Sequence, residues 1–242
     1  MNASVAALLA LLLTSSASYD AVNDYTATFF KQESSEGLLG EKETLFLKFE
    51  KPFKIFLHWH DTHRKGLQVL YERGKHDGKL AIHQPGLMLG LAPVIFLEQS
   101  SPWVREGSES YDIEDAGIGT FLEDFSKMAQ KGIEEKKIDV KISDTVEGAT
   151  VDASFPGTQP GGDYFCSRAE VFFDMKTKLP TRMRLYDWTG KVTGIYEYKD
   201  LKLNVGAQDA EFKKLAERKL YKLFIPPAKV VQRNNFSGRS AS

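Results

Sequence analysis

The sequence predicts an α+β protein built on one long antiparallel sheet of roughly ten strands, with two helices. The clearest sign is the stretch at residues 43–60, where apolar residues alternate with polar ones, because a period of two is typical of β-strands. Short turns separate nearly every pair of further strand-like runs, as in an antiparallel meander. Two other stretches, at the N-terminus and around residue 120, repeat apolar residues every three or four positions and predict helices.

The composition is that of an ordinary globular protein. The chain has 242 residues, of which 42% are hydrophobic and 27% charged, with a net charge of -1. These values disfavour a disordered or membrane-spanning chain, and the absence of a basic block disfavours nucleic acid as a partner. We expect a single domain at residues 19–232, because no linker interrupts the strand pattern, and a flexible tail at 233–242.

Residues 1–18 fit two interpretations. The apolar run at 5–13 and the small residues at 15–18 resemble a secretory signal, although the usual positive segment is missing. Alternatively, residues at three- and four-residue steps describe one long amphipathic helix. That helix would carry Val5, Leu8, Leu9, Leu12, Leu13, Ser16, Tyr19, Val22, Tyr25 and Phe29 on one side. Neither interpretation predicts a transmembrane anchor, because crossing a bilayer takes about 20 apolar residues.

The first half of the predicted sheet centres on residues 43–60. Its apolar face carries Leu45, Leu47, Phe49, Phe53, Ile55, Leu57 and Trp59. The pair Lys51-Pro52 stands between the two alternating runs, and proline cannot donate to a strand ladder, so it predicts a corner between two strands. The opposite face is expected to be wet, with Lys48, Glu50, Lys54, His58 and His60. Further strands are expected at 25–31, 67–72 and 79–83.

The middle of the chain contains an apolar segment and a helix. Residues 87–97 lack a clean period, so their structure stays open, but they are apolar enough to pack on the sheet or to cover an opening in it. Residues 118–128 predict a helix with an apolar face at Ile118, Phe121, Leu122, Phe125 and Met128. We expect Asp115 to cap this helix and Gly132 to end it.

The second half of the chain predicts strands at 138–142, 150–155, 169–173 and 181–185. A last long strand is expected at 192–203, where the apolar positions change from one face to the other. A bulge near Lys199 would explain that change. Residues 220–225 are a candidate closing strand.

Few residues carry recognisable chemistry. His58, His60 and His63 form the best metal candidate, but they lie on the polar face next to a turn, with only Asp61 as a nearby acid, so we predict no metal site. The single cysteine, Cys166, excludes an internal disulfide and is expected to be a small buried residue in a strand. No nucleophile elbow, phosphate loop or dinucleotide fingerprint occurs. We therefore predict neither enzyme activity nor a cofactor.

The predicted sheet has more apolar surface than its helices can cover. Sixteen Phe, nine Tyr and three Trp could simply fill a core, which is the ordinary explanation for any one of them. A large sheet with one apolar face and only two helices, however, leaves apolar surface over. A lipid-sized cavity is one way to use that surface.

Several motifs resemble the LolA-like outer-membrane lipoprotein-sorting proteins. They include residues 25–33 (YTATFFKQE), 47–53 (LKFEKPF) and 66–71 (GLQVLY), and later 174–180 (DMKTKLP) and 198–201 (YKDL) with Asn204. Residues 74–80 and 114–119 (EDAGIG) are similar to a LolA-related bacterial domain family of unknown function. The resemblance spans roughly residues 20–205, and the order of the motifs is more specific than any one of them.

The resemblance implies a curved antiparallel half-barrel with helices against its concave face, an apolar cavity, no enzyme activity and a place in the periplasm or cell envelope. In these carriers an arginine before the proline of this strand pair holds a helical lid shut. The matching residue here is Lys51, which cannot form the same bidentate contacts. Lid or latch candidates are Lys51, Leu87, Leu89, Leu91, Ile118, Phe121 and Leu122.

The leading hypothesis is therefore a binding or carrier protein that holds a lipid, a lipoprotein acyl chain or another hydrophobic ligand. We expect its cavity to be lined by Phe49, Phe53, Ile55, Leu57, Trp59, Val69 and Tyr71. An envelope protein partner and peripheral membrane contact are compatible with this function. The alternatives are a protein-interaction module whose core is filled by its own side chains, and a metal-dependent enzyme using the three histidines.

Overall fold

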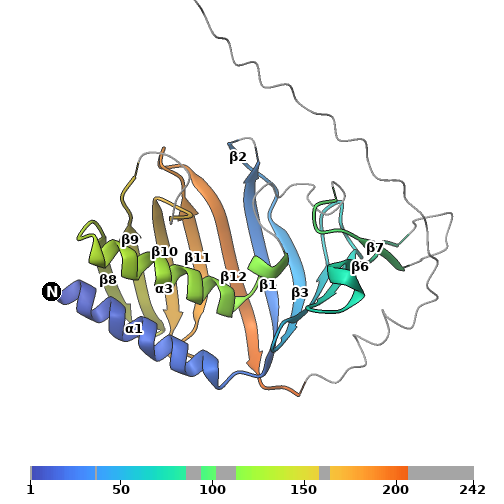
Figure 1. The fold of residues 1–242 in the computed structure, drawn as a ribbon, viewed down its shortest axis with the longest axis horizontal. Helices are drawn as coiled ribbons and strands as arrows, with labels where there is room; N and C mark the ends of the chain where they lie inside the picture. The colour runs from blue at the N-terminus through green and yellow to red at the C-terminus, as the bar shows by residue number, and fades with distance from the viewer. Residues whose placement is uncertain (1, 36, 86–93, 102–112, 158–163, 207–242) are drawn as a thin grey trace, which may run out of the picture.

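In the described part of the chain, one antiparallel sheet of 12 strands forms the body of the protein, and two α-helices lie on one of its faces (Figure 1). This computed structural model describes residues 2–35, 37–85, 94–101, 113–157 and 164–206. The predicted antiparallel α+β class is confirmed, with twelve strands in place of about ten. The candidate strand at 220–225 and the tail at 233–242 lie outside the described residues.

The described helices are α1 (Ala3–Asp20) and α3 (Ile118–Glu134), with short 3-10 turns η1 (His76–Gly78) and η2 (Ile113–Asp115). The strands of the first half are β1 (Asp24–Ser35), β2 (Leu38–Leu39), β3 (Glu43–Glu50), β4 (Lys54–Trp59), β5 (Gln68–Glu72), β6 (Leu80–His83) and β7 (Val94–Leu97). Those of the second half are β8 (Asp139–Thr145), β9 (Gly148–Ser154), β10 (Arg168–Asp174), β11 (Pro180–Tyr186) and β12 (Val192–Leu203).

The strand order is β7-β6-β5-β4-β3-β1-β12-β11-β10-β9-β8, with β2 paired to β1. The first and last long strands, β1 and β12, therefore meet in the middle and join two meanders. Their register shifts between Thr26, opposite Lys202, and Thr28, opposite Lys199. One residue of β1 thus faces two of β12, which confirms the predicted bulge near Lys199 and explains the change of face along β12.

Residues 43–60 form two paired strands, as predicted. Leu45 lies opposite Trp59 and Phe49 opposite Ile55, so the apolar residues of β3 and β4 share one face. The corner between them contains the Lys51-Pro52 bond, which is cis. Residues 94–97, the end of the apolar segment whose structure the sequence left open, form β7 at the edge of the sheet.

The N-terminal stretch is helical, and α1 ends at Asp20, but Leu13, which the amphipathic-helix interpretation placed on the apolar side, is 72% exposed. The extension of that helix to Phe29 was wrong, because Tyr25 and Phe29 lie in β1. By length and composition alone, α1 could cross a membrane, a test that core helices and signal sequences near an N-terminus also pass. In this structure α1 packs against β8 and α3, and it buries Leu8, Leu12 and Ser15.

Helix α3 differs from the prediction at both ends. Its N-cap is Gly117, while the predicted cap, Asp115, lies in η2. The helix continues through Gly132 and ends at Glu134. Gly132 is buried against Ile138, whose Cβ would lie 3.1 Å from a Cβ added at the glycine. The glycine therefore allows close packing inside the helix and does not end it.

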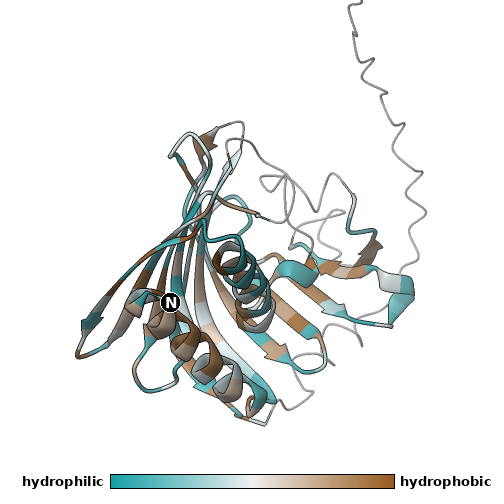
Figure 2. Cartoon of the chain, turned by 60° about the vertical axis from the view of Figure 1, so that its left-hand side comes forward, coloured by the Kyte–Doolittle hydropathy of each residue, from teal (hydrophilic) through white to brown (hydrophobic). Residues whose placement is uncertain are grey.

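The two α-helices cover only part of the sheet. Helix α1 contacts β8, and α3 contacts α1 and β11, so both lie over the β8–β12 half, as Figure 1 shows. Figure 2 shows the sheet curving around them. We call this side the helix face and the opposite side the outer face. Within the described residues, neither α1 nor α3 covers the β3–β7 half of the helix face.

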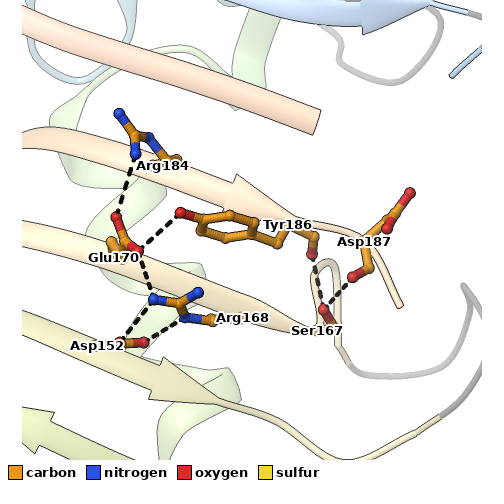
Figure 3. A network of polar contacts seen from close by, with 7 residues as sticks. All are labelled: Asp152, Ser167, Arg168, Glu170, Arg184, Tyr186 and Asp187. Atoms are coloured by element: carbon orange, nitrogen blue, oxygen red, sulfur yellow. Dashed lines mark hydrogen bonds and ion pairs between the residues drawn. The ribbon is translucent and has the colours of Figure 1, made fainter. Parts of the chain in front are cut away.

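The outer face of the β9–β11 strands carries a cross-strand polar network (Figure 3). Arg168 in β10 donates to both carboxylate oxygens of Asp152 in β9, at 2.7 and 2.8 Å, and to Glu170 at 2.5 Å. The hydroxyl of Tyr186 in β11 donates to Glu170 at 2.8 Å. Cross-strand pairs of this kind help to fix the register of a sheet.

The outer face of the other half is less polar than predicted. Phe56, Leu70, Ala81 and Val94 form a second buried apolar cluster there, and the side chain of Lys48 is only 5% exposed. The expectation of a wet face was therefore wrong for these strands. It rested on Lys48, Lys54 and the histidines and gave too little weight to apolar residues of the same parity.

Candidate functional site

An apolar cavity of about 650 Å³ lies on the helix face of the sheet, beside α3. Its described wall comes mainly from the β1 and β3–β7 strands, together with η2, the start of α3 and parts of β11 and β12. The apolar residues that line it are Phe29, Leu45, Leu57, Trp59, Leu67, Val69, Leu80, Ile82, Ile95, Leu97, Ile113, Ala116, Phe121, Phe165, Met183, Leu185, Tyr196 and Tyr198. The volume is in the range of small-molecule pockets.

Three of the seven predicted cavity residues, Leu57, Trp59 and Val69, line this cavity. Ile55 is buried in the core. The remaining three, Phe49, Phe53 and Tyr71, form a chain of aromatic contacts with centroids 5.3 and 5.9 Å apart.

That aromatic chain lies beneath the start of α3. The ring of Phe49 stacks on Tyr25 at 5.1 Å, and the Tyr25 hydroxyl accepts a hydrogen bond from the backbone N–H of Ile118 at 3.1 Å. An added Cβ at Gly117 would lie 3.2 Å from the same hydroxyl. The aromatic residues therefore support the N-terminus of α3 beside the cavity.

The predicted lid residues occupy different places. Phe121 lines the cavity, whereas Ile118 and Leu122 are buried in the core beneath α3. Phe121 also stacks on Phe125 at 5.7 Å, which connects the cavity side of the helix to its packed side. Leu87, Leu89 and Leu91 lie outside the described residues.

Glu114 ties η2 to the sheet just before α3. Its carboxylate accepts hydrogen bonds from the Tyr71 hydroxyl and, at 3.0 Å, from Arg73. The Tyr71 hydrogen bond, assisted by Arg73, lowers the pKa of Glu114 below its ordinary value despite the opposing effect of burial. Burial, followed by the contact with Glu114, raises the pKa of Tyr71 to about 12. The segment leading into α3 is therefore fixed to β5 by an ionised carboxylate.

Lys51, the predicted latch residue, contacts α1. Its Nζ donates to the carbonyl oxygens of Tyr19 at 2.7 Å and Asp20 at 3.3 Å. It also lies 4.4 Å from the centre of the Tyr19 ring. A cation at the C-terminal end of a helix satisfies open carbonyls and complements the helix dipole. Lys51 thus anchors the last turn of α1 to the corner between β3 and β4.

One end of the cavity is polar. Lys31 pairs with Glu33 at 3.0 Å and with Glu43 at 3.3 Å, and Arg64 approaches Glu43 at 3.6 Å. The Tyr196 hydroxyl donates to the second oxygen of Glu33 at 3.0 Å. The four charged side chains are only 12–17% exposed. We call these four residues the charged cluster, of which Lys31, Glu33 and Arg64 line the cavity.

Sequence reasoning missed the charged cluster and most of the cavity wall. Leu80 and Ile82 alternate in the short strand β6, so the period-two signal that identified Leu57 and Trp59 could have included them. The charged cluster has no such signal, because its members come from β1, β3 and the β4–β5 turn. They meet only when β1 pairs with β3 and β4 turns back beside it.

The candidate metal and thiol residues show no reactive arrangement. The rings of His58 and His60 lie 5.1 Å apart, but the described part of the chain holds no group of three metal-ligating side chains. Cys166 is buried, as expected, although it lies just before β10 and not in a strand. Burial raises the pKa of its thiol to about 12, so the thiolate is disfavoured at neutral pH.

A protein-family model described as "Protein of unknown function (DUF1571)" matches residues 22–222. The match begins directly after α1 and includes every described strand. No match is found among the curated proteins.

Solved structures with low identity match most of the chain. A DUF1329 family protein from Desulfovibrio piger is 13% identical, with 90% of this chain and 100% of that chain covered and a TM-score of 0.44. A putative outer membrane lipoprotein-sorting protein domain from Vibrio parahaemolyticus is 12% identical over 87% and 98%, with a TM-score of 0.39. A LolA superfamily protein from Nitrosomonas europaea is 9% identical over 84% and 96%, also at 0.39.

Proposed function

This chain belongs to the DUF1571 family, and we propose that it is a non-enzymatic binding or carrier protein for a lipid, a lipoprotein acyl chain or a similar hydrophobic ligand. The observation that carries the proposal is the cavity of about 650 Å³ on the helix face. In this proposal the curved sheet acts as a half-barrel around the ligand, and α3 acts as one side of a lid.

The two halves of the sheet differ in what packs on their helix face, and this difference supports the proposed function. The β8–β12 half of the sheet buries its apolar residues under α1 and α3, whereas the β3–β7 half turns Leu57, Val69 and Ile82 toward the cavity. Well-packed protein interiors contain few voids larger than a water molecule. A space of this size with an apolar wall is compatible with a hydrophobic ligand.

The free energy available to such a ligand is large. An acyl chain of about 15 methylenes would gain roughly 12 kcal/mol on leaving water, at about 0.8 kcal/mol per methylene and before losses. A carrier must release what it binds, so some part of the wall has to move. We propose α3 and η2, which are held to the sheet by the polar contacts of Glu114.

The alternative function, a protein-interaction module with a self-filled core, requires the helix face to be closed by its own side chains. The cavity favours the carrier function over this alternative. We further propose that the protein acts in the periplasm or cell envelope, where hydrophobic ligands need carriers and where an envelope protein or the membrane surface could supply or accept them.

Native mass spectrometry of gently purified protein, together with titration of a fluorescent fatty acid, tests the proposed function. We expect co-purified hydrophobic ligand or saturable binding of the probe. The Ile82→Trp variant, which places an indole in the cavity, should lose the binding. The matched control is Val146→Trp, because Val146 is 95% exposed in the turn between β8 and β9. Unliganded protein that binds no probe would contradict the proposal.

A further inference from the structure

Beyond the apolar cavity itself, one end of it has unused hydrogen-bond donors. We propose that this end recognises an anionic head group, so that the ligand is a single-chain amphiphile with a carboxylate or phosphate. The proposal rests on the function proposed above, because it needs the apolar part of the ligand to lie in the cavity. It adds the head-group chemistry and the two residues that bind it, Arg64 and Trp59.

The acceptors of the charged cluster already have partners. Glu33 accepts from Lys31 with one oxygen and from the Tyr196 hydroxyl with the other. Glu43 faces Lys31 with one oxygen and Arg64 with the other. Lys31 is shared between the two carboxylates. Every carboxylate oxygen in the cluster is therefore engaged, and the Lys31 ammonium is neutralised by its neighbours.

Arg64, in contrast, uses only part of its donor capacity. Its Nε lies 3.6 Å from Glu43, and its terminal nitrogens make no hydrogen bond or ion pair with the residues that the structure describes. The side chain is nevertheless only 12% exposed, and it lines the cavity. A guanidinium presents a planar fork of donors that matches a carboxylate or phosphate.

Trp59 supplies a second unused donor next to Arg64. Its indole Nε1 is buried and has no hydrogen-bond partner in the described part of the chain, and its side chain is 5% exposed and lines the cavity. The Arg64 guanidinium lies 6.0 Å from the centre of the Trp59 ring. Because a buried donor without a partner is costly, a ligand acceptor that reached this nitrogen would stabilise the complex.

The remaining charges of the cavity favour this orientation of an anionic ligand. Asp115 and Asp124 line the cavity on the side of η2 and α3, so they would repel an anionic head at that side. Because both are exposed to solvent, water and salt weaken this repulsion, and it makes only a minor contribution to the orientation. An amphiphile placed with its head at Arg64 and Trp59 would extend its chain along Leu57 and Val69.

The test compares ligands of one chain length that differ only in the head group. Dodecanoate, dodecyl phosphate, dodecanol and dodecyltrimethylammonium would each displace a neutral fluorescent dye from the intact protein. We expect at least one of the two anions to bind about tenfold or more tightly than dodecanol, the range that charge-assisted hydrogen bonds support. The cation should bind no better than dodecanol. The ratio between dodecanoate and dodecyl phosphate identifies which anion the site prefers.

Two substitutions locate the head-group site, and each has a matched control. Arg64→Gln should reduce the anion preference about tenfold, and Trp59→Phe, which keeps the ring but removes the N–H, about threefold. Arg184→Gln on the outer face is the first control. Trp188→Phe is the second, because the Trp188 Nε1 is also buried without a partner but Trp188 does not line the cavity. Neither control should change the preference.

The possible results separate this proposal from the proposed function. If dodecanol and the anions bind equally well, the carrier function stands and the anionic head group is wrong. An anion preference that survives both Arg64→Gln and Trp59→Phe would also overturn the proposed site. If none of the four amphiphiles displaces the dye, the carrier function itself fails and this proposal fails with it.

Discussion

Lys51 joins the last turn of α1 to the corner between β3 and β4 through hydrogen bonds to two backbone carbonyls. A charge-assisted hydrogen bond of this kind contributes about 1.5–3 kcal/mol where it is well formed. We expect Lys51→Met, which keeps the aliphatic stem, to lower the free energy of unfolding by about 1–2 kcal/mol in urea denaturation.

Lys65→Met is the control for this prediction, because Lys65 is exposed in the turn between β4 and β5. Its effect should stay within about 0.5 kcal/mol. An equal effect of both substitutions would show that Lys51 does not hold α1 in solution.

Glu114 gives the protein a specific dependence on acid pH. Its pKa is lowered in the folded state, first by the hydrogen bond from Tyr71 and then by Arg73. The corresponding stabilisation is therefore present above its unfolded pKa, about 4.5, and is lost as the pH falls below that value. We expect Glu114→Gln to make the free energy of unfolding less dependent on pH between about 5 and 3.

Tyr71 behaves in the opposite sense at alkaline pH. The pKa of Tyr71 is raised to about 12 in the folded protein. The contribution of the protonated Tyr71 hydroxyl to the free energy of unfolding is therefore complete below the ordinary pKa of about 10 and disappears as the pH rises from 10 to 12. Denaturant titrations of the wild type and Tyr71→Phe across both ranges check the two signs. A Tyr71→Phe variant with an unchanged alkaline profile would contradict the assignment.

Helices α1 and α3 meet through a tyrosine, Tyr19, packed on a glycine, Gly119. An added Cβ at Gly119 would lie 2.3 Å from the Tyr19 ring. We therefore expect Gly119→Ala to destabilise the full chain by about 1–3 kcal/mol through overpacking. In a Tyr19→Ala background the same change should stabilise it by up to about 1 kcal/mol, because alanine is the better helix former.

Thermal and urea unfolding of the four proteins in this double-mutant cycle measures the change of sign. If Gly119→Ala has the same effect in both backgrounds, α1 is not packed on α3 in the protein that was purified. That result would be expected if residues 1–18 act as a cleaved signal, so mass determination of the N-terminus belongs to the same experiment.

The order and type of most elements could be predicted because alternation is a strong signal in paired strands. The end of α1 could not. Tyr25 and Phe29 are four residues apart, a spacing that fits one face of a helix and equally one face of a strand. Only the pairing of β1 with both β3 and β12 decides between them. The predicted end of α3 was wrong for a related reason. Gly132 does not end the helix but allows close packing against Ile138, a tertiary contact that the sequence pattern does not show.

At the scale of the whole molecule, the sequence indicated an excess of apolar surface but not where it would remain uncovered. Phe49, Phe53 and Tyr71 share a face with Leu57 and Trp59, yet they lie under the start of α3 and the others line the cavity. The difference depends on where the helices rest, which no periodic pattern encodes. The charged cluster depends on tertiary pairing in the same way, because Lys31, Glu43 and Arg64 are far apart in the sequence.

The open space of the cavity decides the proposed function of the molecule, and a matched pair of substitutions measures that space. Val69 lines the cavity, whereas Val171 is fully buried in the packed core of β10. We expect Val171→Phe to lower the free energy of unfolding by about 1–3 kcal/mol, because a close-packed core cannot accept the larger ring. Val69→Phe should leave stability unchanged or raise it by up to about 2 kcal/mol, because the ring enters empty space.

The two variants should also differ in ligand binding. Val69→Phe takes space from the ligand and should weaken binding of a fluorescent fatty acid, while folded Val171→Phe should bind it as the wild type does. Equal destabilisation by the two substitutions would mean that the helix face is filled by its own side chains in solution. In that case the protein-interaction alternative would replace the carrier, because a filled core leaves no room for an acyl chain.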